Sequence, residues 1–194
     1  MHKRALVTGG AKRLGRAIAL DLARRGHDVA IHYASSAEAA EELAAQIRAM
    51  GRAAAALQAD LLDEDETQAL LGRAAQALGG PITVLVNNAS IFEYDNIATA
   101  TLDSWNRHIG SNLRAPFILT QALAAQVPDP LVDADGEPVA QGVVVNMIDQ
   151  RVRKLTPEFM TYTLAKSALW TLTQTSAMAL APRVRVNAIG PGPT

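Results

Sequence analysis

The stretch that decides the fold runs from Ala5 to Gly15 and reads A-L-V-T-G-G-A-K-R-L-G. Its first three residues predict a short buried strand, and apolar residues at helical spacing (Ile18, Leu22, Ala23) follow its last glycine. A glycine-rich loop between a strand and a helix lets the backbone approach a phosphate, which the helix N-terminus then binds. A plain tight turn also needs glycine, so the prediction of a nucleotide site depends on the surrounding βαβ unit.

The alternation of strand and helix continues along the chain. We expect strands at residues 5–7, 28–33, 53–58, 84–86, 143–148 and 184–188, and helices at about 14–26, 36–50, 62–78, 102–126 and 158–180. This order predicts a single α/β domain over residues 1–194. It is a doubly wound parallel sheet (Rossmann fold) with strand order 3-2-1-4-5-6. Ligands of such a sheet bind at the carboxyl ends of its strands.

Two segments depart from this regular pattern. Pro116 lies inside the longest predicted helix and should bend it or end its first half, because proline lacks a backbone N–H. Residues 127–141 contain three prolines and four acidic residues, which predicts a solvated surface loop.

Composition and charge limit the possible functions. The 194 residues are 49% hydrophobic with a formal net charge of -1, so nothing in the charge balance favours binding to nucleic acid or a membrane surface. The chain has no cysteine and only a brief apolar run near its N-terminus. We therefore expect a cytoplasmic protein without a signal peptide or membrane span. The four histidines show no metal-binding spacing, so we predict no metal site.

Polar side chains without a carboxylate follow the second predicted strand. An acidic residue at this place would hold the ribose 2′-hydroxyl of NAD, but here stand His32, Tyr33, Ser35 and Ser36. Together with Arg13 they suit a 2′-phosphate, which favours NADPH as the cofactor. The alternative is that His32 and the serines only cap the next helix and pack in the core.

Further candidates for cofactor binding lie at the carboxyl ends of other predicted strands. Asp60 could reach an adenine edge, although a helix N-cap or an Asx-turn is the alternative role. The complete set, with the residues above, comprises Gly9, Lys12, Arg13, Leu14, Gly15, Asp60, Leu61, Asn88, Ala89, Ser90, Pro191 and Gly192.

A second group of residues follows the fifth predicted strand. Asp149 ends that strand, and Tyr162 and Lys166 lie four residues apart, so they share one helix face. An ammonium close to a phenol favours the phenolate, so Tyr162 could act as an acid or base nearer neutral pH than a free tyrosine. Such pairs are common on ordinary helices, and the pattern gains meaning only beside a cofactor site.

Phe92 follows the small and amide-bearing residues at the end of the fourth strand. A phenylalanine just after a ligand-facing turn can stack on a planar substrate. Phenylalanine is more often a core residue, and the sequence leaves both roles open.

The chain resembles the short-chain dehydrogenase/reductase family along its whole length. The resemblance rests on T-G-x-x-x-x-x-G at Thr8 to Gly15, N-N-A at Asn87 to Ala89, Asn112, Y-x-x-x-K at Tyr162 to Lys166, and V-N-A-I-G-P-G at Val186 to Gly192. It implies that Asn112, Tyr162 and Lys166 are catalytic. It also implies that Tyr162 and Lys166 contact the cofactor, and that Asn112 holds through its backbone a water that links Lys166 to solvent.

Family resemblance also bears on assembly and length. It implies a homo-oligomer, a tetramer. Family members continue with a substrate-covering loop, a further helix and a seventh strand, and we expect these to be missing from the 194 residues.

Two departures narrow the match within the family. Asp149 stands where the family usually has serine, and Arg13 where it usually has glycine or alanine. With A-K-R-L-G-R, H-Y-x-x-S, N-A-S-I-F and G-S-N-x-x-A-P-F, the chain looks like the pteridine reductases and the related bacterial dihydromonapterin reductases. That resemblance implies that Phe92 stacks on a pterin, that Asp149, Tyr162 and Lys166 form the reaction centre, and that Arg13 touches pyrophosphate and substrate.

The chemistry of Asp149 agrees with this resemblance. An ionised carboxylate would repel the alkoxide-like oxygen of a carbonyl reduction, whereas reduction of a ring C=N needs a proton on nitrogen that a carboxylic acid coupled to Tyr162 could supply. Two alternatives remain: a carbonyl reductase of ketones or quinones, and a protein that binds NADPH without turnover.

Overall fold

The computed structural model describes residues 3–192 and contains a six-stranded sheet in which every pairing is parallel. Residues 1–2 and 193–194 of the predicted domain lie outside the described residues. The strand order is β3-β2-β1-β4-β7-β8, so the predicted order and fold class are confirmed. The strands are β1 (Arg4–Val7), β2 (Asp28–Tyr33), β3 (Ala54–Gln58), β4 (Val84–Asn87), β7 (Gly142–Met147) and β8 (Val184–Ile189).

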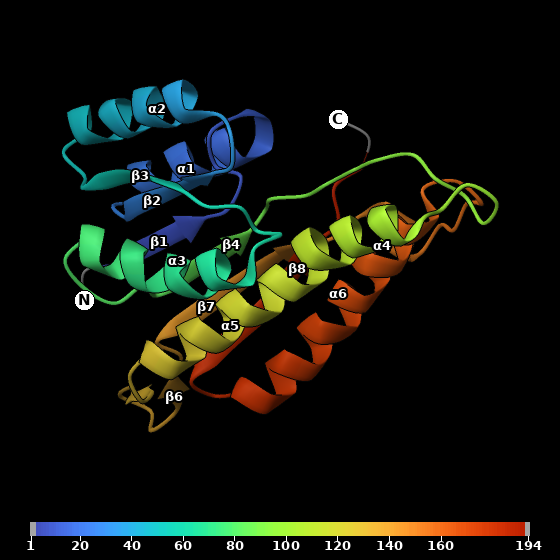
Figure 1. Ribbon diagram of the computed structural model, residues 1–194. Coiled ribbons are helices and arrows are strands. Elements are labelled where there is room, and N and C mark those ends of the chain that lie inside the picture. Colours follow the sequence, from blue (N-terminus) through green and yellow to red (C-terminus); the bar gives the residue numbers. More distant parts are fainter. Residues whose placement is uncertain (1–2, 193–194) are drawn as a thin grey trace.

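Helices cover both faces of the sheet (Figure 1). On one face α1 and α2 contact β1, β2 and β3, and on the other α3, α5 and α6 contact strands from β3 to β8. The helices are α1 (Arg13–Arg24), α2 (Ala37–Ala49), α3 (Glu64–Ala77), α4 (Leu102–Ile109), α5 (Ala115–Gln126) and α6 (Met160–Leu180). Among residues 3–192, no helix combines the length and the apolar character needed to cross a membrane.

The core has two parts because side chains of a strand alternate between the faces of the sheet. Leu6 and Leu85 pack with α3 and α5 on one face, whereas Val7 and Val86 pack with α1 and α2 on the other. All four are buried. Strands buried on both sides read as continuous apolar runs, which is why the sequence identified them.

The longest predicted helix is interrupted, as expected, but the irregular turn comes before the proline. After α4 the backbone forms a π-helical segment, η1 (Gly110–Arg114), and then enters α5, in whose first turn Pro116 lies. Proline fits a first turn because its missing N–H has no intrahelical partner there. Asn112 is a buried residue of the π-helical segment.

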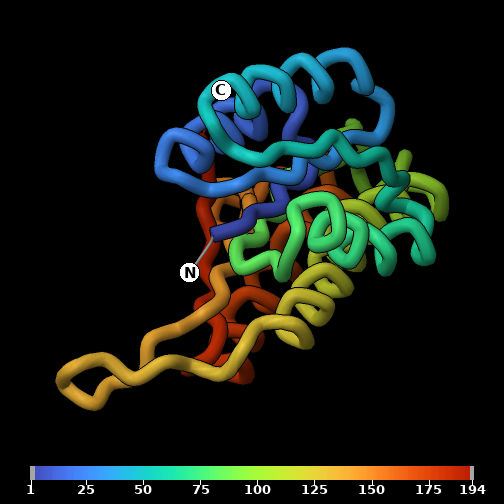
Figure 2. The backbone as a smooth tube through the Cα atoms, turned by 90° about the vertical axis from the view of Figure 1, so that its left-hand side faces the viewer, coloured from blue at the N-terminus to red at the C-terminus, as the bar shows by residue number. Residues whose placement is uncertain are grey.

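The segment at residues 127–141 is more ordered than a solvated loop. It forms a short antiparallel hairpin of β5 (Leu131–Val132) and β6 (Pro138–Val139), which projects away from the body of the molecule (Figure 2). The side chain of Asp133 accepts hydrogen bonds from the backbone N–H groups of Asp135 and Glu137. The prediction missed these strands because two residues are too few to show a periodic pattern.

Candidate active site

A cleft of about 1140 Å³ lies at the carboxyl ends of the strands. The predicted site residues Gly15, Tyr33, Ser36 and Asn112 do not line it. The remaining predicted residues do: Gly9, Lys12, Arg13, Leu14, His32, Ser35, Asp60, Leu61, Asn88, Ala89, Ser90, Phe92, Asp149, Tyr162, Lys166, Pro191 and Gly192.

In the glycine loop, residues 8–15, the glycine positions are packed so tightly that they leave no room for a Cβ. Gly9 has φ +59°, and a Cβ on Gly15 would lie 2.2 Å from the carbonyl oxygen of Gly9. Asn88 braces the loop, because its Nδ2 donates to the carbonyls of Thr8 (3.0 Å) and Gly9 (3.1 Å). The hydroxyl of Thr8 in return accepts from the backbone N–H groups of Asn88 and Ala89.

Two exposed cations, Lys12 and Arg13, belong to this loop and lie where α1 begins. Neither side chain has an acidic partner within residues 3–192. Arg13 also has a φ of 48°, a left-handed conformation that glycine would adopt without strain. The side chain of Arg13 lines the cleft, so it is accessible to a ligand there.

His32 lines the cleft, but its hydrogen bonds match the alternative prediction of a residue that packs within the protein. Its side chain is buried, Nδ1 accepts from the backbone N–H of Gly9 (3.0 Å), and Nε2 lies 3.0 Å from the carbonyl oxygen of Ala59. Burial lowers the pKa of His32, so the neutral ring with its proton on Nε2 satisfies both contacts. Neither nitrogen is free for a ligand.

The other residues predicted to bind the adenosine part of the cofactor differ in where their side chains lie. Some line the cleft, and others cap a helix or pack in the core. Ser36 occupies the N-cap position of α2, although its side chain makes no capping hydrogen bond, and Ser35 lines the cleft. Tyr33 packs partly buried against the core on the α1 and α2 side. The carboxylate of Asp60 accepts from the N–H of Leu62 (2.9 Å), which is the Asx-turn alternative, and Asp60 still faces the cleft.

The predicted reaction centre is assembled at the end of β7 and on α6. The hydroxyl of Tyr162 donates to Oδ2 of Asp149 at 3.0 Å, and the other carboxylate oxygen accepts from the N–H of Arg151 at 2.8 Å. Lys166 is almost fully buried, and its Nζ donates to the carbonyl oxygen of Met147 at 2.7 Å. The three side chains predicted to work together therefore meet at one place.

The electrostatics differ from the expectation for Tyr162 and Lys166. Burial, followed by the carboxylate of Asp149, raises the pKa of Tyr162 above its ordinary value. Burial lowers the pKa of Lys166 to about 8. The expectation that Lys166 brings Tyr162 nearer to neutral pH is wrong for this arrangement, because Asp149 is the hydrogen-bonded neighbour of the phenol and favours its protonated form.

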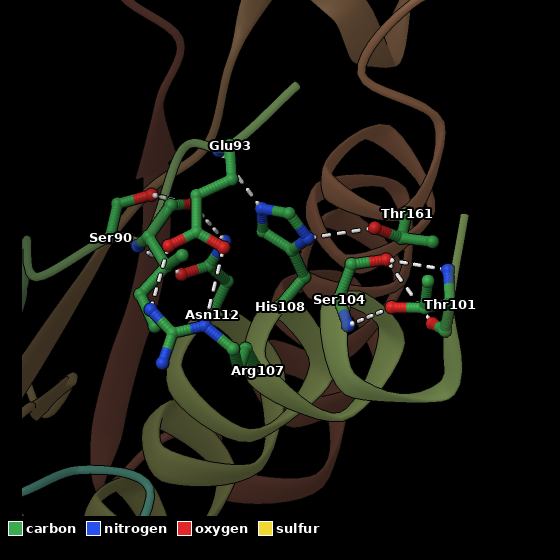
Figure 3. Close-up of polar contacts among 9 residues, drawn as sticks. Ser90, Glu93, Thr101, Ser104, Arg107, His108, Asn112 and Thr161 are labelled. Atoms are coloured by element: carbon green, nitrogen blue, oxygen red, sulfur yellow. Dashed lines mark hydrogen bonds and ion pairs between the residues drawn. The ribbon is translucent and has the colours of Figure 1, made fainter. Parts of the chain in front are cut away.

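Asn112 does not line the cleft but binds the backbone of Ile91, which does. It is fully buried in η1, where its Oδ1 accepts from the N–H of Ile91 and its Nδ2 donates to the carbonyl of Ile91, both at 2.8 Å. Figure 3 shows the side chain of Asn112 near Ser90. The side chain of Asn112 thus holds the 90–96 loop, the segment Ser90 to Asn96 that carries Phe92.

Phe92 is not a core residue, because 53% of its surface is exposed and it lines the cleft. One face of its ring stacks on Phe159, with centroids 4.3 Å apart and planes at 6°. The ring of Tyr162 meets Phe92 edge-on at 4.7 Å, and the guanidinium of Arg151 lies 5.8 Å from the Phe92 centroid. An exposed aromatic surface therefore lies directly beside the ring of Tyr162.

Sequence reasoning missed several residues of this region, including Phe159, Arg151, Asp95, His108 and Thr161. Arg151 and Phe159 are close in sequence to Asp149 and Tyr162, and that proximity was the available signal. No local pattern marks Asp95 and His108. They join the site through contacts with Thr161, 66 and 53 residues away.

Comparison with known proteins places these features among relatives. The family model for short chain dehydrogenases matches residues 3–194. The chain is 34% identical over 193 residues to the 3-oxoacyl-[acyl-carrier-protein] reductase FabG of Staphylococcus aureus, a match that covers 99% of this chain and 74% of the relative.

Two solved structures, both in complex with NADP, are also similar. FolM alternative dihydrofolate reductase 1 from Brucella suis has 45% identity and a TM-score of 0.90, with 99% of this chain and 76% of that chain covered. A short chain dehydrogenase from Burkholderia cenocepacia J2315 has 38% identity and a TM-score of 0.87, with 98% and 74% covered.

Proposed function

The chain belongs to the short-chain dehydrogenase family, and from that premise we propose that this oxidoreductase transfers hydride from NADPH to a ring C=N of a pterin. The observation that carries the proposal is the 3.0 Å hydrogen bond from Tyr162 to the carboxylate of Asp149, with the exposed ring of Phe92 beside it. The similarity to an NADP-bound alternative dihydrofolate reductase supports it.

The residues that line the cleft fit the cofactor. A glycine loop without room for a Cβ lets a pyrophosphate approach the backbone, and Lys12 and Arg13 offer unpaired positive charge next to it. Arg13 and Ser35 are the groups we assign to the 2′-phosphate. We assign Tyr162 and Lys166 to the nicotinamide ribose. NADPH, when bound, supplies the hydride.

The protein's own task is to hold and deliver a proton. A C=N bond is reduced when hydride adds to carbon and a proton adds to the adjacent nitrogen. Tyr162 keeps its proton at neutral pH, because burial and Asp149 raise the pKa of its hydroxyl. We assign the proton that reaches the ring nitrogen to the coupled pair of Tyr162 and Asp149.

The surroundings of the pair suit a flat, polar heterocycle. One face of Phe92 is covered by Phe159, and the ring lines the cleft, so a planar substrate can stack on it next to Tyr162. Asn112 holds the backbone on which Phe92 stands. We assign substrate contacts to Phe92, Asp149, Tyr162 and Arg13.

A second candidate is reduction of a carbonyl group, and the 34% identity to a 3-oxoacyl-[acyl-carrier-protein] reductase favours it. Tyr162 could protonate a carbonyl oxygen as well as a ring nitrogen. Asp149 separates the two candidates, since a carboxylate near a developing oxyanion opposes carbonyl reduction.

The test is NADPH oxidation by the wild-type protein and by Asp149→Ser, assayed with dihydropterins and with an activated ketone. We expect Asp149→Ser to keep its NADPH affinity and to lose about 10²-fold in pterin turnover, the usual contribution of a positioned acid. Ketone turnover should stay level or rise. Asp149→Asn is the matched control, because it keeps an acceptor for Tyr162 but cannot supply a proton. Full pterin turnover by Asp149→Ser would overturn the proposal.

Assembly and location are also proposals. The family resemblance supports a homo-oligomer, a tetramer, and the absence of cysteine agrees with a cytoplasmic location. Light scattering coupled to size-exclusion chromatography tests the first, and a monomer at micromolar concentration would contradict it. Fractionation of the native host tests the second.

A further inference from the structure

The 90–96 loop has almost no backbone pairing of its own. The N–H groups of Ile91, Glu93 and Asn96 donate to side chains, which belong to Asn112, His108 and Thr99. A loop held in this way has the conformation that its side-chain partners impose. The position of Phe92 therefore depends on residues that do not touch the substrate.

His108 is the central partner of this loop. It lies on α4 with a fully buried ring, its Nε2 accepts from the N–H of Glu93 at 3.1 Å, and its Nδ1 lies 2.7 Å from Oγ1 of Thr161 (Figure 3). Because the N–H of Glu93 can only donate, Nε2 is the unprotonated nitrogen. Nδ1 of the neutral ring then donates to Thr161.

A buried carboxylate fixes the direction of this chain of hydrogen bonds. The hydroxyl of Thr161 donates to Oδ2 of Asp95, which also accepts from Ser104 at 3.0 Å, and the N–H of Thr161 donates to Oδ1 at 3.1 Å. Burial raises the pKa of Asp95, but the hydrogen bonds from Thr161 and Ser104 outweigh it and leave the pKa below its ordinary value. Asp95 therefore stays an acceptor, and Thr161 must receive from His108.

The two hydrogen-bond partners of His108 are sequence neighbours of Phe92 and Tyr162, the proposed stacking residue and proton donor. Glu93 directly follows Phe92, and Thr161 directly precedes Tyr162. The imidazole also meets the ring of Tyr162 edge-on, with centroids 6.0 Å apart. One rigid ring thus joins the backbone of the stacking residue to the helix turn of the proton donor.

We propose that His108 is a positioning residue, which sets the ring of Phe92 relative to the hydroxyl of Tyr162 through its separate bonds to Glu93 and Thr161. The part of the inference that concerns Phe92 rests on the proposed pterin reduction. The part that concerns Tyr162 does not, because Tyr162 would donate a proton in carbonyl reduction as well. A neighbouring ion pair between Arg107 and Glu93 is partly exposed and holds only the side chain of Glu93, so it cannot replace the backbone contact.

A substitution can retain one of the two His108 hydrogen bonds and remove the other. The reason is that an asparagine amide reaches about as far as Nδ1, and a glutamine amide about as far as Nε2. His108→Gln keeps an acceptor for Glu93, and His108→Asn keeps a donor for Thr161. His108→Leu keeps neither. His27→Gln is the matched control, since His27 directly precedes β2, at the end away from the cleft, and contacts the carbonyl oxygen of Leu22.

The measurement is kcat and KM for a dihydropterin, with NADPH affinity and melting temperature for every variant. For His108→Asn we expect a near-normal kcat and a KM raised at least about tenfold, because Phe92 is released. For His108→Gln we expect the reverse, with kcat lowered at least about tenfold. NADPH affinity should stay within about threefold in both, as in His27→Gln.

Equal kinetic changes in the Asn and Gln variants, in proportion to their loss of melting temperature, would overturn the proposal and leave His108 a merely structural residue. The Asn and Gln pair decides this even if His108→Leu fails to fold. A wild-type protein that reduces ketones but no pterin would instead overturn the proposed function. The positioning of Tyr162 by His108 would then be tested by kcat for the ketone, which should be lower in His108→Gln than in His108→Asn.

Discussion

The glycine loop at residues 8–15 and the loop at residues 90–96 line the same cleft, but different contacts hold them. In the first, the backbone is shaped by glycines, by the strand before it and by the brace from Asn88. In the second, side chains of α4 and η1 bind a backbone that pairs little with itself, and the backbone N–H of Thr161 in α6 donates to the side chain of Asp95 in the loop. The cofactor end of the cleft is thus built from local geometry, and the substrate end from distant contacts.

The largest effect on cofactor binding is expected where the first loop leaves no space for a side chain. Gly15→Ala would place a Cβ 2.2 Å from the carbonyl oxygen of Gly9 and 2.6 Å from Nδ2 of Asn88, so the loop must move. We expect NADPH to bind at least about 100-fold more weakly, or about 2.7 kcal/mol, in an isothermal titration.

Gly72→Ala provides the control for this prediction. Gly72 is also in a helix, and nothing lies within 4 Å of its would-be Cβ, so alanine there should stabilise the protein by about 0.5–1 kcal/mol. Equal NADPH affinity in the two alanine variants would show that the first loop tolerates a side chain.

Asn112→Ala removes the side chain that makes two hydrogen bonds to the backbone of the 90–96 loop. Both backbone groups of Ile91 lose their partner, at a cost of about 1–3 kcal/mol each, so the free energy of unfolding should fall by roughly 3 kcal/mol. Asn106→Ala, at an exposed position on the preceding helix, is the control. If urea unfolding gives the same stability for both variants, the 90–96 loop does not depend on Asn112.

Lys166 lines the same cleft as the two loops, and its burial should make the stability of the protein depend on pH. Burial lowers the pKa of Lys166 from 10.5 to about 8. Between these values the unfolded chain holds a proton that the folded chain has released, so the free energy of unfolding rises with pH. We expect Lys166→Met to remove a rise of about 2 kcal/mol between about pH 8 and 10, measured without NADPH. Parallel stability curves for the two proteins would contradict the buried, weakly basic lysine.

The smallest effect is expected for Arg107→Gln. The ion pair with Glu93 is short, at 2.6 Å, but its side chains are 37% and 46% exposed. Exposed pairs contribute about 0–1 kcal/mol, so stability should fall by less than about 1 kcal/mol. Substrate KM should change much less than in His108→Asn. A KM raised as strongly as in that variant would show that the Arg107–Glu93 ion pair, and not His108, holds the 90–96 loop.

Much of the fold could be predicted because its signals are local. The apolar runs at Ala5–Val7 and Val143–Val145, the glycines that end the first run and the helical spacing between strands each occupy a few neighbouring residues. The alternation gave the strand order, because right-handed crossovers leave few ways to arrange parallel strands. The hairpin at 131–139 was missed because its strands are too short to show a period.

The sequence also placed Asp149, Tyr162 and Lys166 at one end of the sheet, since each stands at a strand end or one helix turn from another. It could not decide their electrostatics. Only the tertiary structure buries Lys166 against the carbonyl of Met147 and sets Asp149 against the phenol, which reverses the expected effect on Tyr162. The same holds for His32, whose nitrogens are taken by Gly9 and Ala59, and for His108, whose partners are 15 and 53 residues away. Periodicity and motifs report where the backbone goes, whereas a hydrogen-bond partner and a shifted pKa are set by which distant groups meet in the folded interior.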